Sequence, residues 1–93
     1  MRAYLIASVR IKDPQKWGEY TEGAKELIEG CGGSVLVFDK QPTVLVGDFP
    51  YSVQVILKFP SQDILQTWFN SDAYKLLVPV RDEGADVLFI AAH

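Results

Sequence analysis

Side chains suited to chemistry are few in this chain of 93 residues. The only histidine is His93, the last residue, and the only cysteine is Cys31. A protein metal site needs several ligands, and a Ser-His-Asp or Cys-His nucleophile needs a histidine that the fold can position. The sequence therefore predicts no metal site, no bound cofactor and no nucleophile of these kinds, and it identifies no catalytic residue.

Aromatic residues with a polar group are the first candidates for contact with a small molecule, namely Tyr20, Trp68 and Tyr74. Their rings are apolar, whereas the hydroxyl or indole N–H can hydrogen-bond, and ligand pockets use both properties. All three also fall at helical spacing on faces that we expect to be buried. Packing in the core explains them equally well, so both interpretations stay open here.

A serine and two arginines complete the candidates. Ser8 and Arg10 share one face of the first expected strand, where a hydroxyl and a guanidinium could hold a carboxylate or a ketone. For Arg10 we favour the alternative that its long side chain reaches solvent at the strand end. Arg81 precedes Asp82, so it either binds an anion or forms a surface ion pair worth about 0–1 kcal/mol.

The first half of the chain supplies a strand and a helix that would position these residues. Residues 3–11 are rich in apolar and β-branched side chains and predict a strand with two largely apolar faces. Asp13 followed by Pro14 is typical of a helix start, and apolar side chains at helical spacing extend the helix over 14–30. Glycines at 30–33 are expected to end it.

The second half repeats this order less regularly. Residues 34–38 predict a strand, and 43–47 predict a further piece, either in a hairpin or as part of one bulged strand. Clean alternation over 52–59 predicts the next strand, with the side chains of 53, 55, 57 and 59 on one face. Ser61 is the expected N-cap of a second helix.

The last part of the chain is expected to hold a short helix and a final strand. The segment 70–72 breaks the second helix and caps a short one that contains Tyr74, which Pro79 should end or kink. Residues 85–92 predict the last strand. The order βαββαβ predicts an α+β, ferredoxin-like fold with an antiparallel sheet and two helices on one face.

Composition and charge exclude several classes of protein. Apolar residues make up 48% and the net charge is −3, with basic residues scattered beside acidic ones. A nucleic-acid interface would need a basic surface, and an anionic membrane would need one too, so neither is an expected partner. No apolar run approaches the roughly 18 residues of a membrane helix, and no leader is recognisable. We expect one domain, residues 1–93, in the cytoplasm.

The expected helices leave one sheet face uncovered. The opposite faces of the strands are also apolar, and exposed they would form a patch larger than a soluble monomer usually carries. Packing of two sheets about a two-fold axis would cover it. The sequence thus predicts a homodimer.

With these elements placed, the whole chain resembles a small bacterial family of unknown function, numbered 1330, in the dimeric α/β-barrel superfamily. The resemblance rests on the order and spacing of Tyr4, Asp13-Pro14, Tyr20, Gly32-Gly33, Gly47-Asp48-Phe49, Phe59-Pro60-Ser61, Trp68, the segment 70–74 and Arg81. At Ser8 the chain departs from relatives that often have histidine, which weakens any acid–base chemistry carried over to that position.

The resemblance implies a sheet-to-sheet dimer and a small-molecule pocket between each sheet and its helices. Superfamily relatives include monooxygenases that degrade heme or form quinones, a chlorite-decomposing branch and muconolactone isomerases. Transferred to this chain, the expected ligand contacts are Ser8, Tyr20, Trp68, Tyr74 and Arg81.

Two hypotheses on function follow. The first is a small-molecule binder or cofactor-independent enzyme, monooxygenase- or isomerase-like, acting on a small organic acid, phenol or ketone. Its strand-one contact would be Ser8, facing the pocket under the helices. The alternative is a non-catalytic homodimeric interaction module with a fully packed interior. A cavity of a few hundred Å³ would separate the two.

Overall fold

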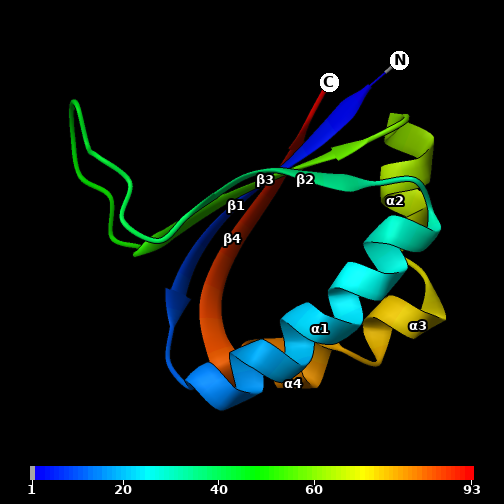
Figure 1. The fold of residues 1–93 in the computed structure, drawn as a ribbon, viewed down its shortest axis with the longest axis horizontal. Helices are drawn as coiled ribbons and strands as arrows, with labels where there is room; N and C mark the ends of the chain where they lie inside the picture. The colour runs from blue at the N-terminus through cyan, green and yellow to red at the C-terminus, as the bar shows by residue number, and fades with distance from the viewer. Residues whose placement is uncertain (1) are drawn as a thin grey trace.

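The computed structural model of the chain describes residues 2–93 and contains four strands and four helices within them. Their bounds are β1 Ala3–Ile11, α1 Pro14–Gly30, β2 Ser34–Asp39, β3 Val53–Phe59, α2 Gln62–Phe69, α3 Asp72–Lys75, α4 Val78–Gly84 and β4 Ala85–Ala92 (Figure 1). The predicted helix over 14–30 and the predicted strands over 3–11 and 85–92 are confirmed with the same bounds.

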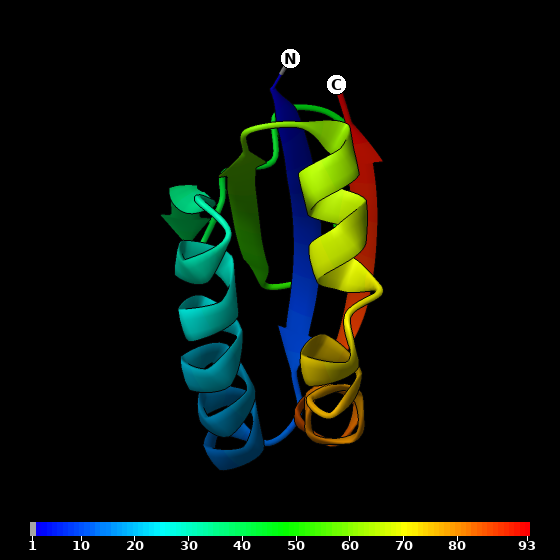
Figure 2. The ribbon, with the colours of Figure 1, turned by 90° about the vertical axis from the view of Figure 1, so that its right-hand side faces the viewer.

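The four strands form one antiparallel sheet in the order β2-β3-β1-β4. The helices all lie on one face of this curved sheet, so the molecule has two layers (Figures 1 and 2). This arrangement confirms the predicted α+β, ferredoxin-like fold. Because β1 is central, with β3 and β4 on its two sides, its side chains face the middle of each surface of the sheet.

Side chains of β1 alternate strictly between the two sheet faces, and this sets where the core lies. Ala3, Leu5, Ala7 and Val9 are buried under the helices, and Ala3 and Val9 have no exposed surface. The alternate residues belong to the opposite face, which we call the outer face. It comprises Tyr4, Ile6 and Ser8 together with their register neighbours Gln54, Ile56, Leu88 and Ile90.

Helix α1 begins and ends where its local sequence predicts. The Asp13 carboxylate accepts hydrogen bonds from the backbone N–H groups of Gln15 and Lys16, at 3.1 and 3.2 Å, and Pro14 follows it. These bonds satisfy N–H groups that have no partner inside the helix. Gly32, with φ +84°, adopts the left-handed conformation beyond the helix end, as expected for glycine at this position.

The connection from α4 into β4 packs directly against the start of α1. The carbonyl oxygen of Gly84 accepts hydrogen bonds from the N–H groups of Lys12 and Asp13, at 2.8 and 3.0 Å. A Cβ placed on Gly84 would lie 2.6 Å from the backbone nitrogen of Trp17. Glycine is therefore required for this close approach.

The segment between β3 and β4 forms three helices, and a serine side chain caps the first two of them. The hydroxyl of Ser61 accepts from the N–H of Ile64 and that of Ser71 from the N–H of Tyr74, both at 3.1 Å, which confirms both predicted caps. The prediction that Pro79 ends or kinks the short helix is wrong. Pro79 lies in the first turn of α4, where a missing N–H costs no helical bond.

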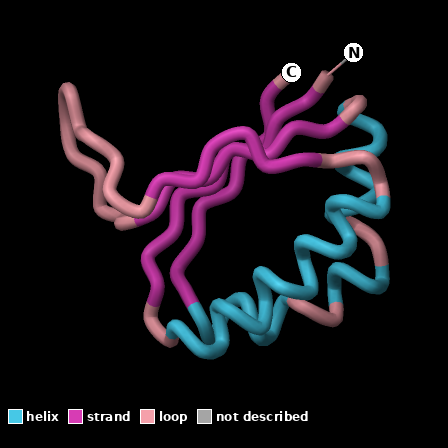
Figure 3. Tube along the Cα trace, viewed as in Figure 1, coloured by secondary structure: helices cyan, strands magenta, loops and turns pink. Residues whose placement is uncertain are grey.

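The segment between β2 and β3 is a long loop rather than a further strand. The predicted strand over 43–47 is therefore wrong: residues 40–52, which we call the arm, project away from the sheet without regular structure (Figures 1 and 3). Near its tip, Leu45 and Val46 are 89% and 95% exposed. Residues 34–38 and 43–47 therefore form neither the predicted hairpin nor one bulged strand, and the register shift that the structure has lies within β2, between Val35 and Val37.

Candidate functional site

A cavity of about 500 Å³ lies between the sheet and α1. The sheet contributes Leu5, Ala7 and Val9 from β1, all with side chains on the helix-facing side. A volume of this size falls in the range of small-molecule sites. The interior is therefore not fully packed, contrary to the alternative expected from sequence.

Aromatic side chains make up much of the remaining wall of this cavity. Trp17 and Tyr20 come from α1, Trp68 from α2 and Phe89 from β4. The rings of Trp17 and Tyr20 lie 4.9 Å apart. Such a wall favours a largely apolar ligand with one or two polar atoms.

Charged side chains line the cavity only where α1 meets solvent. Lys25 and Glu29 are among the lining residues, and their side chains are 71% and 63% exposed. Val35 and Phe38 of β2 also line the cavity and are about half exposed. The opening of the cavity therefore lies between α1 and β2. The charged side chains are confined to this opening, and no charged side chain among residues 2–93 lines the interior.

A chain of three polar side chains runs behind the aromatic wall. The hydroxyls of Tyr20 and Tyr74 are 2.8 Å apart, and a terminal guanidinium nitrogen of Arg81 donates to the Tyr74 hydroxyl at 3.1 Å. Tyr20 lines the cavity, whereas Tyr74 and Arg81 do not. The structure thus brings together three of the residues expected from sequence, but only the first of them reaches the cavity.

Burial determines the ionisation of this chain. Tyr20 is 5% exposed, and its burial, reinforced by the neighbouring Tyr74, raises the pKa of its phenol far above the ordinary value. Tyr20 therefore stays protonated at neutral pH. Burial opposes the charge on Arg81, but hydrogen bonds to Tyr74 and Asp82 outweigh this effect and leave the pKa of Arg81 raised.

Arg81 is more enclosed than a surface ion pair would be. Its side chain is 15% exposed, its Nε donates to Asp82 at 3.0 Å, and its guanidinium carbon lies 5.6 Å from the centre of the Phe89 ring. Arg81 thus forms the ion pair with a neighbouring acid that the sequence offered as an alternative, but its side chain is not at the surface as that alternative assumed. The guanidinium is held by Tyr74, Asp82 and Phe89.

Trp68 contacts both the cavity and the core. Its ring lies 5.1 Å from that of Phe59 and 4.6 Å from that of Tyr74, and the residue also lines the cavity. Its indole Nε1 is buried and has no hydrogen-bond partner among residues 2–93. The core interpretation and the ligand interpretation of Trp68 are therefore compatible.

Ser8 lies on the opposite side of the sheet from the cavity. Its predicted position under the helices is wrong, because the cavity is lined by Ala7 and Val9 and Ser8 belongs to the outer face. There its hydroxyl donates to the side-chain oxygen of Gln54 at 3.1 Å, and the Gln54 amide donates to the carbonyl of Ala7. Ser8 is therefore a hydrogen-bonded residue of the outer face.

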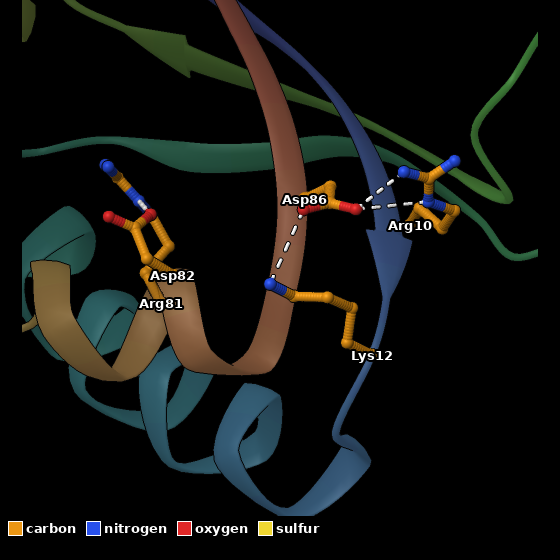
Figure 4. Close-up of polar contacts among 5 residues, drawn as sticks. All are labelled: Arg10, Lys12, Arg81, Asp82 and Asp86. Carbon is orange, nitrogen blue, oxygen red and sulfur yellow. Dashed lines mark hydrogen bonds and ion pairs between the residues drawn. The ribbon is translucent and has the colours of Figure 1, made fainter.

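Arg10 also lies away from the cavity. It donates two hydrogen bonds to Asp86, at 2.6 and 3.2 Å, and Lys12 approaches the same carboxylate at 3.5 Å (Figure 4). The Arg10 side chain is 58% exposed, which confirms that it reaches solvent. Hydrogen bonding from Arg10 holds the pKa of Asp86 below its usual value.

Sequence reasoning missed several residues of the cavity wall. Phe89 alternates with the outer-face residues Leu88 and Ile90, and all three are large and apolar, so composition gave no sign of which one faces the helices. The sequence also gave no sign that Ala7, rather than its neighbours Ile6 and Ser8, faces the helices. Its small side chain lines the cavity from the sheet side, where a larger side chain would take up part of the volume.

Residues 2–93 have neither the ligand cluster of a metal site nor a helix suited to crossing a membrane. They contain no group of three or more histidine, cysteine, aspartate or glutamate side chains arranged to hold a metal ion. In the same residues, none of the helices has the length and apolar character needed to cross a bilayer.

Known structures similar to this chain share its fold. The RPA0582 protein of unknown function from Rhodopseudomonas palustris is 17% identical, with a TM-score of 0.81 over 98% of this chain and 80% of that one. A dimeric ferredoxin-like protein of unknown function from a Jannaschia species is 9% identical, with a TM-score of 0.72 over 100% and 99%. SnoaB from Streptomyces nogalater, a cofactor-independent oxygenase, is 6% identical, with a TM-score of 0.68 over 99% and 91%.

Sequence comparison identifies the family. No curated protein matches the chain significantly. A family model described as "Domain of unknown function (DUF1330)" matches residues 2–92, nearly the whole length. The family that the sequence resembled is thus confirmed, and the chain belongs to the DUF1330 family.

Proposed function

We propose that this protein binds a largely apolar small molecule, such as a phenol or a ketone, in the cavity between its sheet and α1. The observation that supports this most directly is the cavity of about 500 Å³ with its wall of Trp17, Tyr20, Trp68 and Phe89. Burial of an aromatic ligand there would contribute roughly 25 cal/mol for each Å² of apolar surface removed from water.

Organic acids fit this site less well than phenols and ketones. The guanidinium of Arg81 does not line the cavity, and Tyr74 and Asp82 already accept its hydrogen bonds. The exposed Lys25 is accompanied by Glu29, 4.0 Å away. A buried carboxylate would therefore lack a free cationic partner in the cavity, and burying an unpaired charge is costly.

We further propose that the working unit is a homodimer joined through the outer face. Leu88 and Ile90 are each about half exposed there and, with Ile6 and Ile56, form a continuous apolar surface across β3, β1 and β4. A second copy packed sheet to sheet would remove this surface from water. The dimeric ferredoxin-like protein from Jannaschia, which has a similar fold, supports this assembly.

Cofactor-independent oxygenation of the bound molecule is a second candidate function. It is favoured by the similarity of the fold to SnoaB, which is described as a cofactor-independent oxygenase. In this chain the reaction would convert a phenol such as 1-naphthol and one O2 into a quinone and one water. One oxygen atom becomes the new carbonyl on a ring carbon, and the other leaves as water with the hydroxyl hydrogen and the hydrogen of that carbon. Oxygen uptake with 1-naphthol as the probe tests it: uptake that depends on the protein supports catalysis, and an unchanged rate leaves binding alone.

A thermal-shift screen of phenols, ketones, and aromatic and aliphatic acids tests the binding proposal. Ala24 lines the cavity and is buried, so Ala24→Leu should partly fill the cavity and abolish ligand-induced shifts. Ala73→Leu makes the same change at an exposed position of α3 outside this cavity and should leave the shifts intact. Equal responses of both variants and the original chain would contradict the proposed site.

A further inference from the structure

The hydroxyls of the two buried tyrosines, Tyr20 and Tyr74, carry two hydrogens, but residues 2–93 supply an acceptor for only one of them. Each hydroxyl carries one hydrogen and can accept two hydrogen bonds. The guanidinium of Arg81 has no acceptor, so it must donate to the Tyr74 oxygen. The bond between the Tyr74 and Tyr20 hydroxyls can run in either direction, and the heavy-atom positions alone leave both open.

Consider first the case in which Tyr20 donates to Tyr74. The Tyr74 oxygen would then accept from both Tyr20 and Arg81, and its own hydrogen would need another acceptor. Among residues 2–93, neither hydroxyl has a further hydrogen-bond partner. Tyr74 is 1% exposed and does not line the cavity, so its hydrogen would be buried without a partner. A buried unsatisfied donor costs about 1–3 kcal/mol.

The opposite direction avoids this penalty. If Tyr74 donates to Tyr20, the Tyr74 hydroxyl both donates and accepts, and of the two hydroxyl hydrogens the one left over belongs to Tyr20. Of the three residues, Tyr20 is the one that lines the cavity, so water or a ligand there is the acceptor available to that hydrogen. A donor at the end of a hydrogen-bonded chain that begins at a cation is also polarised and strengthened.

From this arrangement we infer that Arg81, Tyr74 and Tyr20 form a directed hydrogen-bond relay that presents a donor to the cavity, and that the ligand carries a matching acceptor oxygen such as a ketone carbonyl. Tyr20 is the binding residue, and Tyr74 and Arg81 are positioning residues. The inference rests on the proposed ligand cavity and adds the polar chemistry that the ligand must have.

A pair of isosteric probes tests the acceptor requirement. 2-Acetylnaphthalene and 2-isopropenylnaphthalene have nearly the same shape, but only the ketone has an acceptor oxygen. Their dissociation constants are measured by titrating the ¹⁵N-labelled full chain and following amide shifts of Ala7 and Ala24, which line the cavity. We expect the ketone to bind about 3- to 10-fold more tightly, the worth of one neutral hydrogen bond.

Two tyrosine variants show whether Tyr20 supplies that donor. In Tyr20→Phe the preference for the ketone should fall to about 1, while the affinity for the alkene stays nearly unchanged. Tyr4→Phe makes the same chemical change on the outer face and should keep the original preference. A preference that survives Tyr20→Phe would overturn the inference.

Two variants of Arg81 test the direction of the relay. The measured quantity is the ratio of the two dissociation constants, which a change in stability alone would leave unaltered. Arg81→Met removes the obligatory donor to Tyr74, so the ratio of the two dissociation constants should fall toward 1. Arg81→Lys should retain most of the ratio, because an ammonium group also only donates. A ratio that is equal in both variants would contradict the positioning role of Arg81.

The outcomes separate this inference from the proposed function. If both probes bind at the cavity amides with equal affinity, the cavity is a ligand site but the directed relay is wrong. If neither probe shifts those amides, the proposed function fails, and the inference fails with it. A preference for the ketone that Tyr20→Phe abolishes supports both.

Discussion

Tyr20 shows how burial changes the behaviour of a single residue. Its phenol sits among apolar side chains beside the Tyr74 hydroxyl, so the charged form is strongly disfavoured in the folded protein. In the unfolded chain the same group titrates near its ordinary value of 10.0. This difference in pKa links the stability of the fold to alkaline pH.

The first prediction is that stability falls above pH 10 and that Tyr20→Phe reduces the fall. Above the unfolded pKa of 10.0 the unfolded chain releases the Tyr20 proton, whereas the native state retains it. The unfolded state is then favoured by up to about 1.4 kcal/mol per pH unit. Urea unfolding between pH 8 and 11.5 measures this effect. If the free energy of unfolding falls equally with pH in the original chain and in Tyr20→Phe, the raised pKa of Tyr20 is contradicted.

The second prediction concerns two glycines with opposite surroundings. In Gly84→Ala the new Cβ would lie 2.6 and 2.9 Å from the backbone N and Cα of Trp17, neither of which can rotate away. We expect the free energy of unfolding to fall by about 1–3 kcal/mol, as it does at other overpacked sites. Gly18→Ala is the control. Gly18 lies in α1, where a Cβ meets nothing within 4 Å, so the change should raise the free energy of unfolding by roughly 0.5–1 kcal/mol. Similar unfolding midpoints for both variants would refute the packing account.

At the scale of the elements, the sequence predicted best what short-range interactions decide. The cap and proline at Asp13 and Pro14 and the glycine at 32 act within a few residues, so the bounds of α1 could be read directly. The segment 43–47 has the same apolar alternation as a strand but lacks a paired neighbour in the sheet. Strand pairing is a long-range property that the local pattern does not contain.

The error at Ser8 has a related cause. Both faces of β1 are apolar, so period-2 alternation separates the residues into two sets without saying which set the helices cover. The small residues Ala3 and Ala7 turned out to mark the covered face, where α2 packs against β1 and the cavity separates β1 from α1. The aromatic candidates Tyr20, Trp68 and Tyr74 were placed correctly as buried, since helical periodicity identifies one face only.

The third prediction tests the cap that places Tyr74. The Ser71 hydroxyl accepts from the N–H of Tyr74 at 3.1 Å and donates to the carbonyl of Trp68 at 2.7 Å. Ser71→Ala should cost about 1 kcal/mol, the usual worth of an N-cap. Thr67→Ala, on the exposed side of α2, should change the free energy of unfolding by less than about 0.5 kcal/mol. Chemical denaturation measures the free energy of unfolding of both variants. Equal changes in this free energy would argue against a stabilising cap at Ser71.

At the scale of the whole molecule, the fourth prediction is a dimer that depends on the outer face. Light scattering should give about twice the chain mass of 10.4 kDa. Ile90→Asp places a charge in the proposed sheet-to-sheet contact and should shift the mass toward that of one chain. Leu76→Asp alters a residue that is 81% exposed on the helical side and should leave the mass unchanged. A mass near 10.4 kDa for the unaltered chain at micromolar concentration would refute the dimer.

The proposed pairing through the apolar outer face would make the stability of the fold depend on the protein concentration. If folding and pairing are coupled through this face, the unfolding equilibrium includes the protein concentration. Each tenfold dilution then lowers the stability of the dimer by about 1.4 kcal/mol, and the melting temperature falls with it. In such a dimer, mass action would link how much of the chain is present to how much of it is folded.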